Sequence, residues 1–256
     1  MFLDDEEDII NFIPSVLSGN RFLLFNGNSF TKKVLGFFNH VDEFIADNAH
    51  DALPPDFYSE RFSCMFDVMR INDTEIKKSY NPVLKRERAI EQTLKSTELC
   101  AKNPDARIII NTSSFAENEY TYEKYQKNCR RVLSQHISKI PRWKEHHPNI
   151  KYKGLLIYDK TECYFDGYVE HDLEDQFIFL TKKDKPLVLH ESWKDKSLIE
   201  PVYESELDFI VWLCPYKPYG TVCLEYGIDY PEMVIADVRY PNDRFADYTD
   251  CHLVSM

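Results

Sequence analysis

Apolar residues recur at helical spacing in four segments of the chain's first 140 residues. Pro14 interrupts the first segment and is expected to kink or split it. Asn28 or Ser29 can cap the second, and Pro82 fits the first turn of the third because its missing N–H would be unpaired there. The spacing therefore predicts helices over residues 5–17, 29–47, 82–102 and 120–140.

Shorter apolar runs predict β-strands, and most of them lie after residue 150. The expected strands are residues 21–25, 61–71, 107–111, 154–158, 176–180, 187–190, 208–213, 222–225 and 233–238. No strand is expected between the helix over residues 29–47 and Arg61. The fold class that follows is α/β (mixed α+β), with a central mixed β-sheet flanked by helices, a helix-rich N-terminal half and a β-rich C-terminal half. We expect one domain over residues 1–256, with a division into 1–150 and 151–256 as the alternative.

Composition favours a cytoplasmic protein without a membrane anchor. The opening residues are acidic where a signal peptide would be basic, and no apolar run approaches the roughly 18 residues that a membrane helix needs. The seven cysteines are scattered and form no CxxC pair, which is typical of reduced, mostly buried thiols. Only 7 glycines are present, which disfavours glycine-rich nucleotide-binding folds.

Charge is distributed in three blocks along the chain. The net charge is −9 over residues 1–75, +9 over residues 76–160 and −12 over residues 161–256. A basic middle between two acidic flanks indicates a local surface for an anionic partner, and we expect nucleic acid to bind through residues 76–153. The phosphate-contacting residues would be Lys124, Lys127, Arg130 and Arg131, which lie on one polar helix segment.

Two features of that helix leave its role open. Tyr120, Tyr122 and Tyr125 could stack on bases if exposed. Tyr122 and Tyr125, however, share a face with Cys129, Val132 and His136 at the spacing of a buried helix face. The basic side chains could equally pair with acidic neighbours on the surface. The histidines show no zinc-type spacing, so each is expected to be structural or exposed.

One motif suggests metal chemistry. Pro55-Asp56 is followed by Asp67 on an expected strand and then by Glu75-Ile76-Lys77. Over about residues 30–112 this pattern resembles the PD-(D/E)xK nuclease-like superfamily, in which carboxylates on adjacent strands hold Mg²⁺ and a lysine positions the attacking water. The amphipathic helices before and after this unit also match the order of that family's core.

The resemblance implies a site built from Asp67, Glu75 and Lys77. If a hairpin forms about Asn72-Asp73, Asp67 and Glu75 would be the Mg²⁺ ligands and Lys77 would orient water or phosphate, with Asp56 left in a loop. Glu43 is a further acidic candidate. The function implied is a Mg²⁺-dependent, nuclease-like phosphodiesterase acting on nucleic acid.

A non-catalytic role is the alternative. The last third of the chain carries closely spaced acidic residues at Glu170, Asp172, Glu174 and Asp175. Such a segment could bind a basic protein partner, shield the protein's own basic helix or mimic nucleic acid. This alternative predicts salt-sensitive association without turnover.

Overall fold

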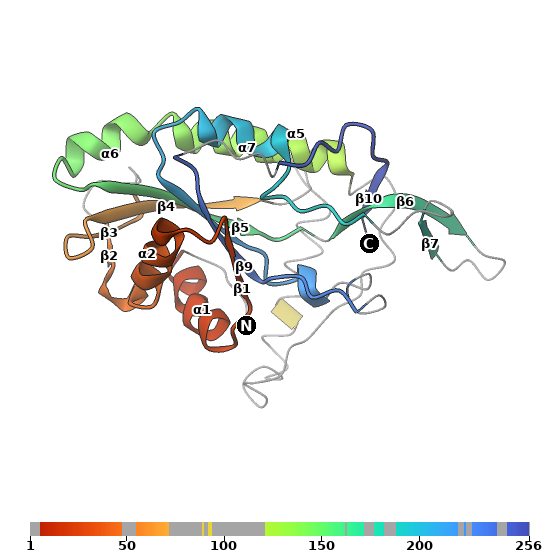
Figure 1. Ribbon diagram of the computed structural model, residues 1–256, viewed down its shortest axis with the longest axis horizontal. Coiled ribbons are helices and arrows are strands. Elements are labelled where there is room, and N and C mark those ends of the chain that lie inside the picture. Colours follow the sequence, from red (N-terminus) through yellow and green to blue (C-terminus); the bar gives the residue numbers. More distant parts are fainter. Residues whose placement is uncertain are drawn as a thin grey trace.

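The structure of the protein is a computed structural model (Figure 1). It describes residues 6–47, 55–71, 89, 92–93, 121–161, 163–171, 177–181, 188–219, 223, 227–239 and 245–255. The expected helix over residues 82–102 lies almost wholly outside these residues, and the expected strand over residues 107–111 lies outside them entirely.

A mixed seven-stranded sheet forms the centre of the fold, and helices pack on it, which confirms the predicted α/β class. The strand order is β1-β9-β8-β5-β4-β3-β2. The strands are β1 (Phe22–Phe25), β2 (Ile45–Ala46), β3 (Phe57–Ser59), β4 (Cys64–Ile71), β5 (Tyr152–Asp159), β8 (Phe209–Leu213) and β9 (Met233–Asp237). β4, β5 and β8 run parallel to one another, whereas β3 is antiparallel to both β2 and β4.

Helices cover both faces of this sheet (Figure 1). Helices α1 (Glu6–Ser18) and α2 (Ser29–Phe38) lie on one face. Helices α5 (Tyr122–Ile137), α6 (Ile140–His146) and α7 (Lys196–Tyr203) lie on the other. The parallel strands β4 and β5 are buried on both faces, as is typical of sheets covered by helices on each side.

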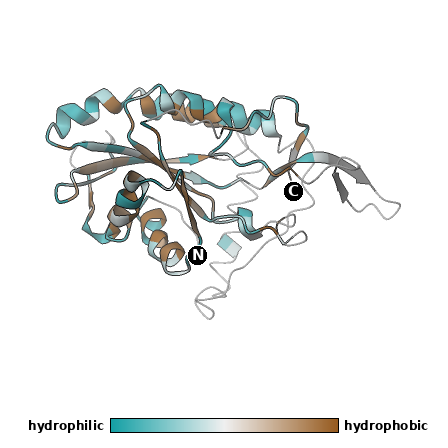
Figure 2. Cartoon of the chain, in the orientation of Figure 1, coloured by the Kyte–Doolittle hydropathy of each residue, from teal (hydrophilic) through white to brown (hydrophobic). Residues whose placement is uncertain are grey.

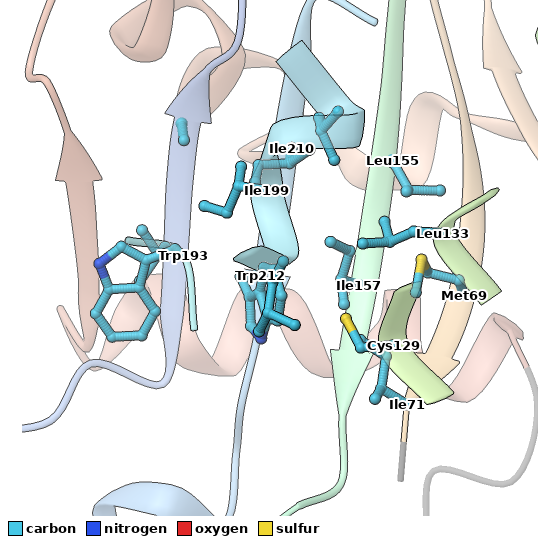
Figure 3. Packing of buried hydrophobic residues seen from close by; sticks show 14 of the residues in the cluster. Met69, Ile71, Cys129, Leu133, Leu155, Ile157, Trp193, Ile199, Ile210 and Trp212 are labelled. Carbon is cyan, nitrogen blue, oxygen red and sulfur yellow. The ribbon is translucent and has the colours of Figure 1, made fainter. Parts of the chain in front are cut away.

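Alternation along β4 determines which side chains meet which layer. Phe66 and Val68 join the hydrophobic core under α1 and α2, and Met65 and Met69 join the core under α5 and α7. Figure 3 shows the second core, where Met69 lies close to Leu133 and Cys129 of α5. Asp67 stands between Met65 and Met69 and therefore faces α5. In Figure 2 the brown core-facing residues of the helices contrast with their teal outer faces.

The N-terminal elements follow the predicted pattern with two corrections. Pro14 lies inside α1, which runs through it as one helix rather than splitting. Helix α2 ends at Phe38, not near residue 47, because the chain turns at Asn39 and His40 into the short 3-10 helix η1 (Val41–Glu43) and then into β2. The expectation that no strand lies between this helix and Arg61 was therefore wrong, since both β2 and β3 lie there.

The later half is β-rich as predicted, but it contains elements that the apolar pattern did not indicate. A second sheet, in the order β10-β6-β7, joins β10 (Leu253–Ser255), β6 (Tyr164–His171) and β7 (Phe177–Thr181). β6, β10 and α7 were not predicted, and the run at residues 187–190 forms an isolated bridge at Leu189 instead of a strand. The 3-10 helix η3 (Lys217–Tyr219) follows β8.

The expected single helix over residues 120–140 is two helices. α5 is capped by the Thr121 side chain, which accepts a hydrogen bond from Lys124 N at 3.3 Å. It ends at Ile137, and Pro141 lies in the first turn of the next helix, α6, rather than closing the first. Within the described part of the chain, no helix is both long enough and apolar enough to cross a bilayer.

Candidate functional site

Two carboxylates face each other across neighbouring strands of the central sheet. In the antiparallel register of β3 and β4, Phe57 pairs with Phe66, so one further step places Asp56 opposite Asp67. Residues directly opposite in such a ladder have side chains on the same face and about 5 Å apart at Cβ. The Asp56 and Asp67 carboxyl groups hydrogen bond to each other, and Val68 N donates to Asp56 Oδ2 at 2.7 Å.

This placement has a strong electrostatic consequence for Asp56. Burial, the negative charge of Asp67 and the hydrogen bond between the two carboxyls raise the pKa of Asp56 to about 8. The hydrogen bond from Val68 N–H acts in the opposite direction but is outweighed. Without a bound cation, the pair therefore retains a proton at neutral pH, since two adjacent buried carboxylates resist being ionised together.

A histidine from α5 completes the group. His136 Nδ1 contacts Asp67 Oδ2 at hydrogen-bond distance, and Asp67 is almost fully buried. The contact joins the last turn of α5 to the middle of β4. An imidazole held by a carboxylate is a common arrangement for proton transfer in enzymes.

These residues line an open cleft of about 420 Å³ beneath one flank of α5. Its polar wall consists of Glu6, Asp56, Asp67, Arg70, Arg131, Gln135, His136 and Lys139. Arg70 Nη2 lies 3.9 Å from Glu6 Oε1. The cleft thus places carboxylates on the sheet opposite cationic side chains on the helix, an arrangement suited to a cation and an anion bound together.

The structure describes the position of only one of the three predicted site residues, Asp67. Asp67 lies in the cleft, and so does Asp56, which the sequence had assigned to a loop away from the metal pair. Glu75 and Lys77 lie outside the described residues, so the expected Asp67–Glu75 pair stays a prediction. Glu43 is not among the residues that line the cleft, and it binds Arg61 instead.

The four basic residues expected on one surface of α5 are divided by the helix geometry. Arg131 lines the cleft, whereas Arg130 does not. Consecutive residues of a helix point about 100° apart, so Arg130 lies on the flank toward α7, where Gln126 Nε2 donates to Ser197 Oγ at 2.7 Å. Counted from Arg131, Lys127 lies about one turn and Lys124 about two turns toward the start of α5.

Tyr125 is buried and Tyr122 is partly buried, so the structure favours the buried helix face over base stacking, the two possibilities that the spacing left open; Tyr120 lies outside the described residues. Tyr125 is fully buried and donates to Ser192 Oγ at 2.9 Å. Tyr122 is partly buried and hydrogen bonds to the buried carboxylate of Asp195. Both rings pack against the buried ring of Tyr164.

The histidines in the described part of the chain form no zinc-type site. His147 Nε2 lies 2.9 Å from Asp47 Oδ2, and His190 Nε2 lies 2.7 Å from Asp195 Oδ2. Among the residues that the structure describes, no group of three or more His, Cys, Asp or Glu side chains is arranged to hold a metal. Mg²⁺ needs fewer protein ligands than this, because it is commonly held by one or two carboxylates together with waters and substrate phosphates.

Sequence reasoning missed the role of His136. The helical pattern placed His136 on the apolar face of α5, and a histidine there indicated only that it would meet the sheet. Its contact with Asp67 depends on the angle and position at which α5 packs across β4, and the spacing of apolar residues does not predict these. The signal for Asp56 was present, since Pro55-Asp56 precedes the short strand β3, but three residues were too few to predict as a strand.

Comparison of the chain with protein-family models gave no match, and searches of curated proteins and of solved structures gave no significant match either.

Proposed function

We propose that the protein is a Mg²⁺-dependent, nuclease-like phosphodiesterase that acts on nucleic acid at the cleft between β4 and α5. The observation that carries the proposal is the Asp56–Asp67 pair, two carboxylates on the same face of adjacent strands. This arrangement agrees with what the resemblance to the PD-(D/E)xK superfamily implies. Within the described residues, the partner of Asp67 is Asp56. Glu75, which lies outside them, stays a predicted further ligand.

The energetics of the pair favour a cation. Holding two carboxylates side by side in a half-buried place costs free energy unless a proton or a cation stands between them. A divalent ion with hard oxygen preference would remove that repulsion and bind through both groups. The raised pKa of Asp56 is the metal-free counterpart of the same effect.

Each residue around the pair has a chemical part in this proposal. Asp56 and Asp67 would hold Mg²⁺, which when bound activates water and stabilises the charge of a phosphoryl group. His136 holds Asp67 in place through Nδ1 and is positioned to carry a proton. The family's lysine stands two residues after a carboxylate, which in this chain is Lys77 after Glu75. Two residues after Asp67 stands the buried Met69, so the cation at the described part of the site would come from Lys77, by expectation, or from the basic residues of α5.

Metal binding and cleavage test the proposal together. Mg²⁺ and Mn²⁺ binding would be measured by calorimetry, and cleavage of DNA and RNA by gel electrophoresis, for wild type, Asp56→Asn and Asp67→Asn. Both variants are expected to lose metal binding and to lower cleavage by at least about 100-fold, as expected when a ligand of the catalytic ion is removed.

Glu43→Gln is the matched control, because Glu43 is acidic, close in sequence and outside the cleft. It should bind metal and cleave as wild type does. Cleavage that persists undiminished in both aspartate variants would rule out this site, and loss in all three variants would point to a general effect on folding.

The non-catalytic alternative stays a separate hypothesis. Its acidic segment lies mostly outside the described residues, since only Glu170 belongs to a described strand, β6. It predicts a salt-sensitive complex with a basic protein and no turnover. A low-salt pull-down that recovers no partner would count heavily against it.

A further inference from the structure

Two arginines line the cleft, Arg70 and Arg131, and they differ in what holds the guanidinium group. Its Nη2 donates to Asn128 Oδ1 at 2.7 Å, and its Nη1 donates to Gln135 Oε1 at 3.1 Å. Both acceptors are neutral amides on the same helix. Among the described residues, no carboxylate lies within 4 Å of the Arg131 guanidinium, whereas Arg70, the other arginine that lines the cleft, has its Nη2 3.9 Å from Glu6 Oε1.

Neutral acceptors fix a guanidinium in direction without cancelling its charge. A guanidinium has five N–H donors, and the two amide bonds use only one donor from each Nη. The remaining N–H groups and the full positive charge are left for an anion, and a planar fork suits the paired oxygens of a phosphate. In a protein of net charge −12, such a cation held only by amides marks a place for an anionic ligand.

The position of Arg131 connects this anion site to the acidic pair. Arg131 lines the same cleft as Asp56 and Asp67. A phosphodiester approaching two carboxylates is repelled unless a cation faces them, and Arg131 provides that cation from the opposite wall. Lys139 also lines the cleft, but an ammonium group is a point charge without the paired geometry of a guanidinium.

We propose that Arg131 binds the reacting phosphate of the substrate, and that Asn128 and Gln135 are positioning residues for it. The proposal rests on the proposed function and deepens it. It distinguishes the residue that binds the reacting phosphate from residues that contact the phosphates on either side of it in the nucleic acid. Arg130, on the flank toward α7, belongs to neither role at the cleft.

Two changes of charge test this assignment, each with a neighbour as its control. Arg131→Gln should lower kcat for cleavage of a short fluorescein-labelled oligonucleotide by about 100-fold or more, with a smaller effect on KM. Arg131→Lys should recover only part of this loss. Arg130→Gln, the same change one residue away, should leave kcat within about threefold.

The second change leaves Arg131 in place and cancels its charge. Gln135→Glu converts an amide acceptor into a carboxylate of the same size, and it should lower kcat by about 10-fold or more. Ser134→Glu adds the same charge at an exposed neighbouring position of α5 and should have little effect. A merely structural role of Gln135 would not distinguish these two variants, since both positions are exposed.

The binding of the same oligonucleotide, followed by fluorescence anisotropy with and without Mg²⁺, separates the ways in which the ideas can fail. If wild type cleaves and Arg131→Gln cleaves equally well, the role of Arg131 is overturned and the proposed function stands. If wild type does not cleave, the proposed function fails and the binding data decide about Arg131. Affinity that falls at least 10-fold in Arg131→Gln but not in Arg130→Gln then supports an anion site, and equal affinity overturns it.

Discussion

Lys217 Nζ lies 3.3 Å from Asp159 Oδ2, and both side chains are fully buried. Burial acts to lower the pKa of Lys217, but the charge of Asp159 outweighs it, so the pKa lies above its usual value of 10.5. Lys217 Nζ also donates to Thr161 Oγ1 at 2.9 Å, and Trp212 Nε1 donates to Asp159 Oδ2 at 2.9 Å. The pair therefore ties η3 to the end of β5 and to β8.

Removing one charge of this pair should be costly. Lys217→Met leaves Asp159 buried without its cation, and we expect the free energy of unfolding to fall by about 3–5 kcal/mol. Urea unfolding followed by circular dichroism measures the change. Lys144→Met removes the same charge from the exposed pair with Glu206 and should cost about 1 kcal/mol or less. Equal losses in the two variants would show that the buried pair contributes no more to the free energy of unfolding than the exposed pair does.

The pairing of Asp56 with Asp67 should be visible as a pH dependence of the metal-free protein. The folded-state pKa of Asp56 is about 8, against an ordinary value of 3.8. Between these two values the folded state keeps a proton that the unfolded state releases, so stability falls as pH rises through the window. Asp56→Asn keeps an oxygen for Val68 N–H. It should raise the free energy of unfolding at pH 9, by up to about 1.4 kcal/mol for each pH unit of the window, and change it little at pH 4.

Urea unfolding in EDTA from pH 4 to pH 9 checks this expectation. Asp42→Asn, at an exposed position of η1, is the control and should keep the pH slope of wild type. If Asp56→Asn also keeps that slope, the two carboxyls do not interact as their register implies.

His190 predicts the opposite pH dependence. It is completely buried, and burial lowers its pKa below the usual 6.5 even though the hydrogen bond to Asp195 acts against this. The unfolded chain therefore takes up a proton below about pH 6.5 that the folded protein refuses, and stability is lost as pH falls through that range. The slope from this one group reaches about 1.4 kcal/mol per pH unit.

His190→Gln removes the titrating group and keeps a donor for Asp195. Its free energy of unfolding should vary less than that of wild type between pH 5 and pH 6.5, as measured by urea titrations. Asp195 does not titrate between pH 5 and pH 6.5, because hydrogen bonds from His190 and Tyr122 outweigh burial and hold its pKa below 3.8. The exposed His40 provides a control in His40→Gln, and a wild-type slope in both variants would contradict the prediction.

The sequence predicted the long elements well because each has a period of its own. α1, β4, β5 and most of α5 fall where the spacing of apolar residues placed them. Most of the elements it missed are short or interrupted: β2 has two residues, β3 has three, and α7 contains Pro201. The eight-residue strand β6 was missed as well, because its sequence contains Asp166-Gly167, a pair typical of turns. Phe44 and Val41 continue the spacing of α2, so nothing in their pattern marks the end of that helix at Phe38.

The site was predicted less completely for the same reason. Asp67 could be placed on a strand, but its partner depends on a register, and the register requires β3. Arg131 could be assigned to a basic helix, but its separation from Arg130 requires knowing which flank of α5 faces the cleft. The composition of the site thus depends on contacts between elements, and the spacing of residues within one element does not predict those contacts.

Gly154 is where the central sheet leaves no room for a side chain. It pairs with Phe209 in the register of β5 and β8, and a Cβ at Gly154 would overlap the ring of Phe209. That ring is fully buried and meets Phe38 edge to face, so it cannot move without disturbing the core under α2. We expect Gly154→Ala to lower the free energy of unfolding by about 2 kcal/mol or more.

Gly36 provides the matched comparison, because a Cβ there meets nothing within 4 Å and the residue lies inside α2. Gly36→Ala should raise the free energy of unfolding by about 0.5–1 kcal/mol, since alanine loses less backbone freedom on folding than glycine does. The same substitution is thus expected to act with opposite sign at the two positions, measured by urea unfolding under one set of conditions. A loss at Gly36, or none at Gly154, would contradict the packing described for that site, because the methyl group is the same and only its surroundings differ.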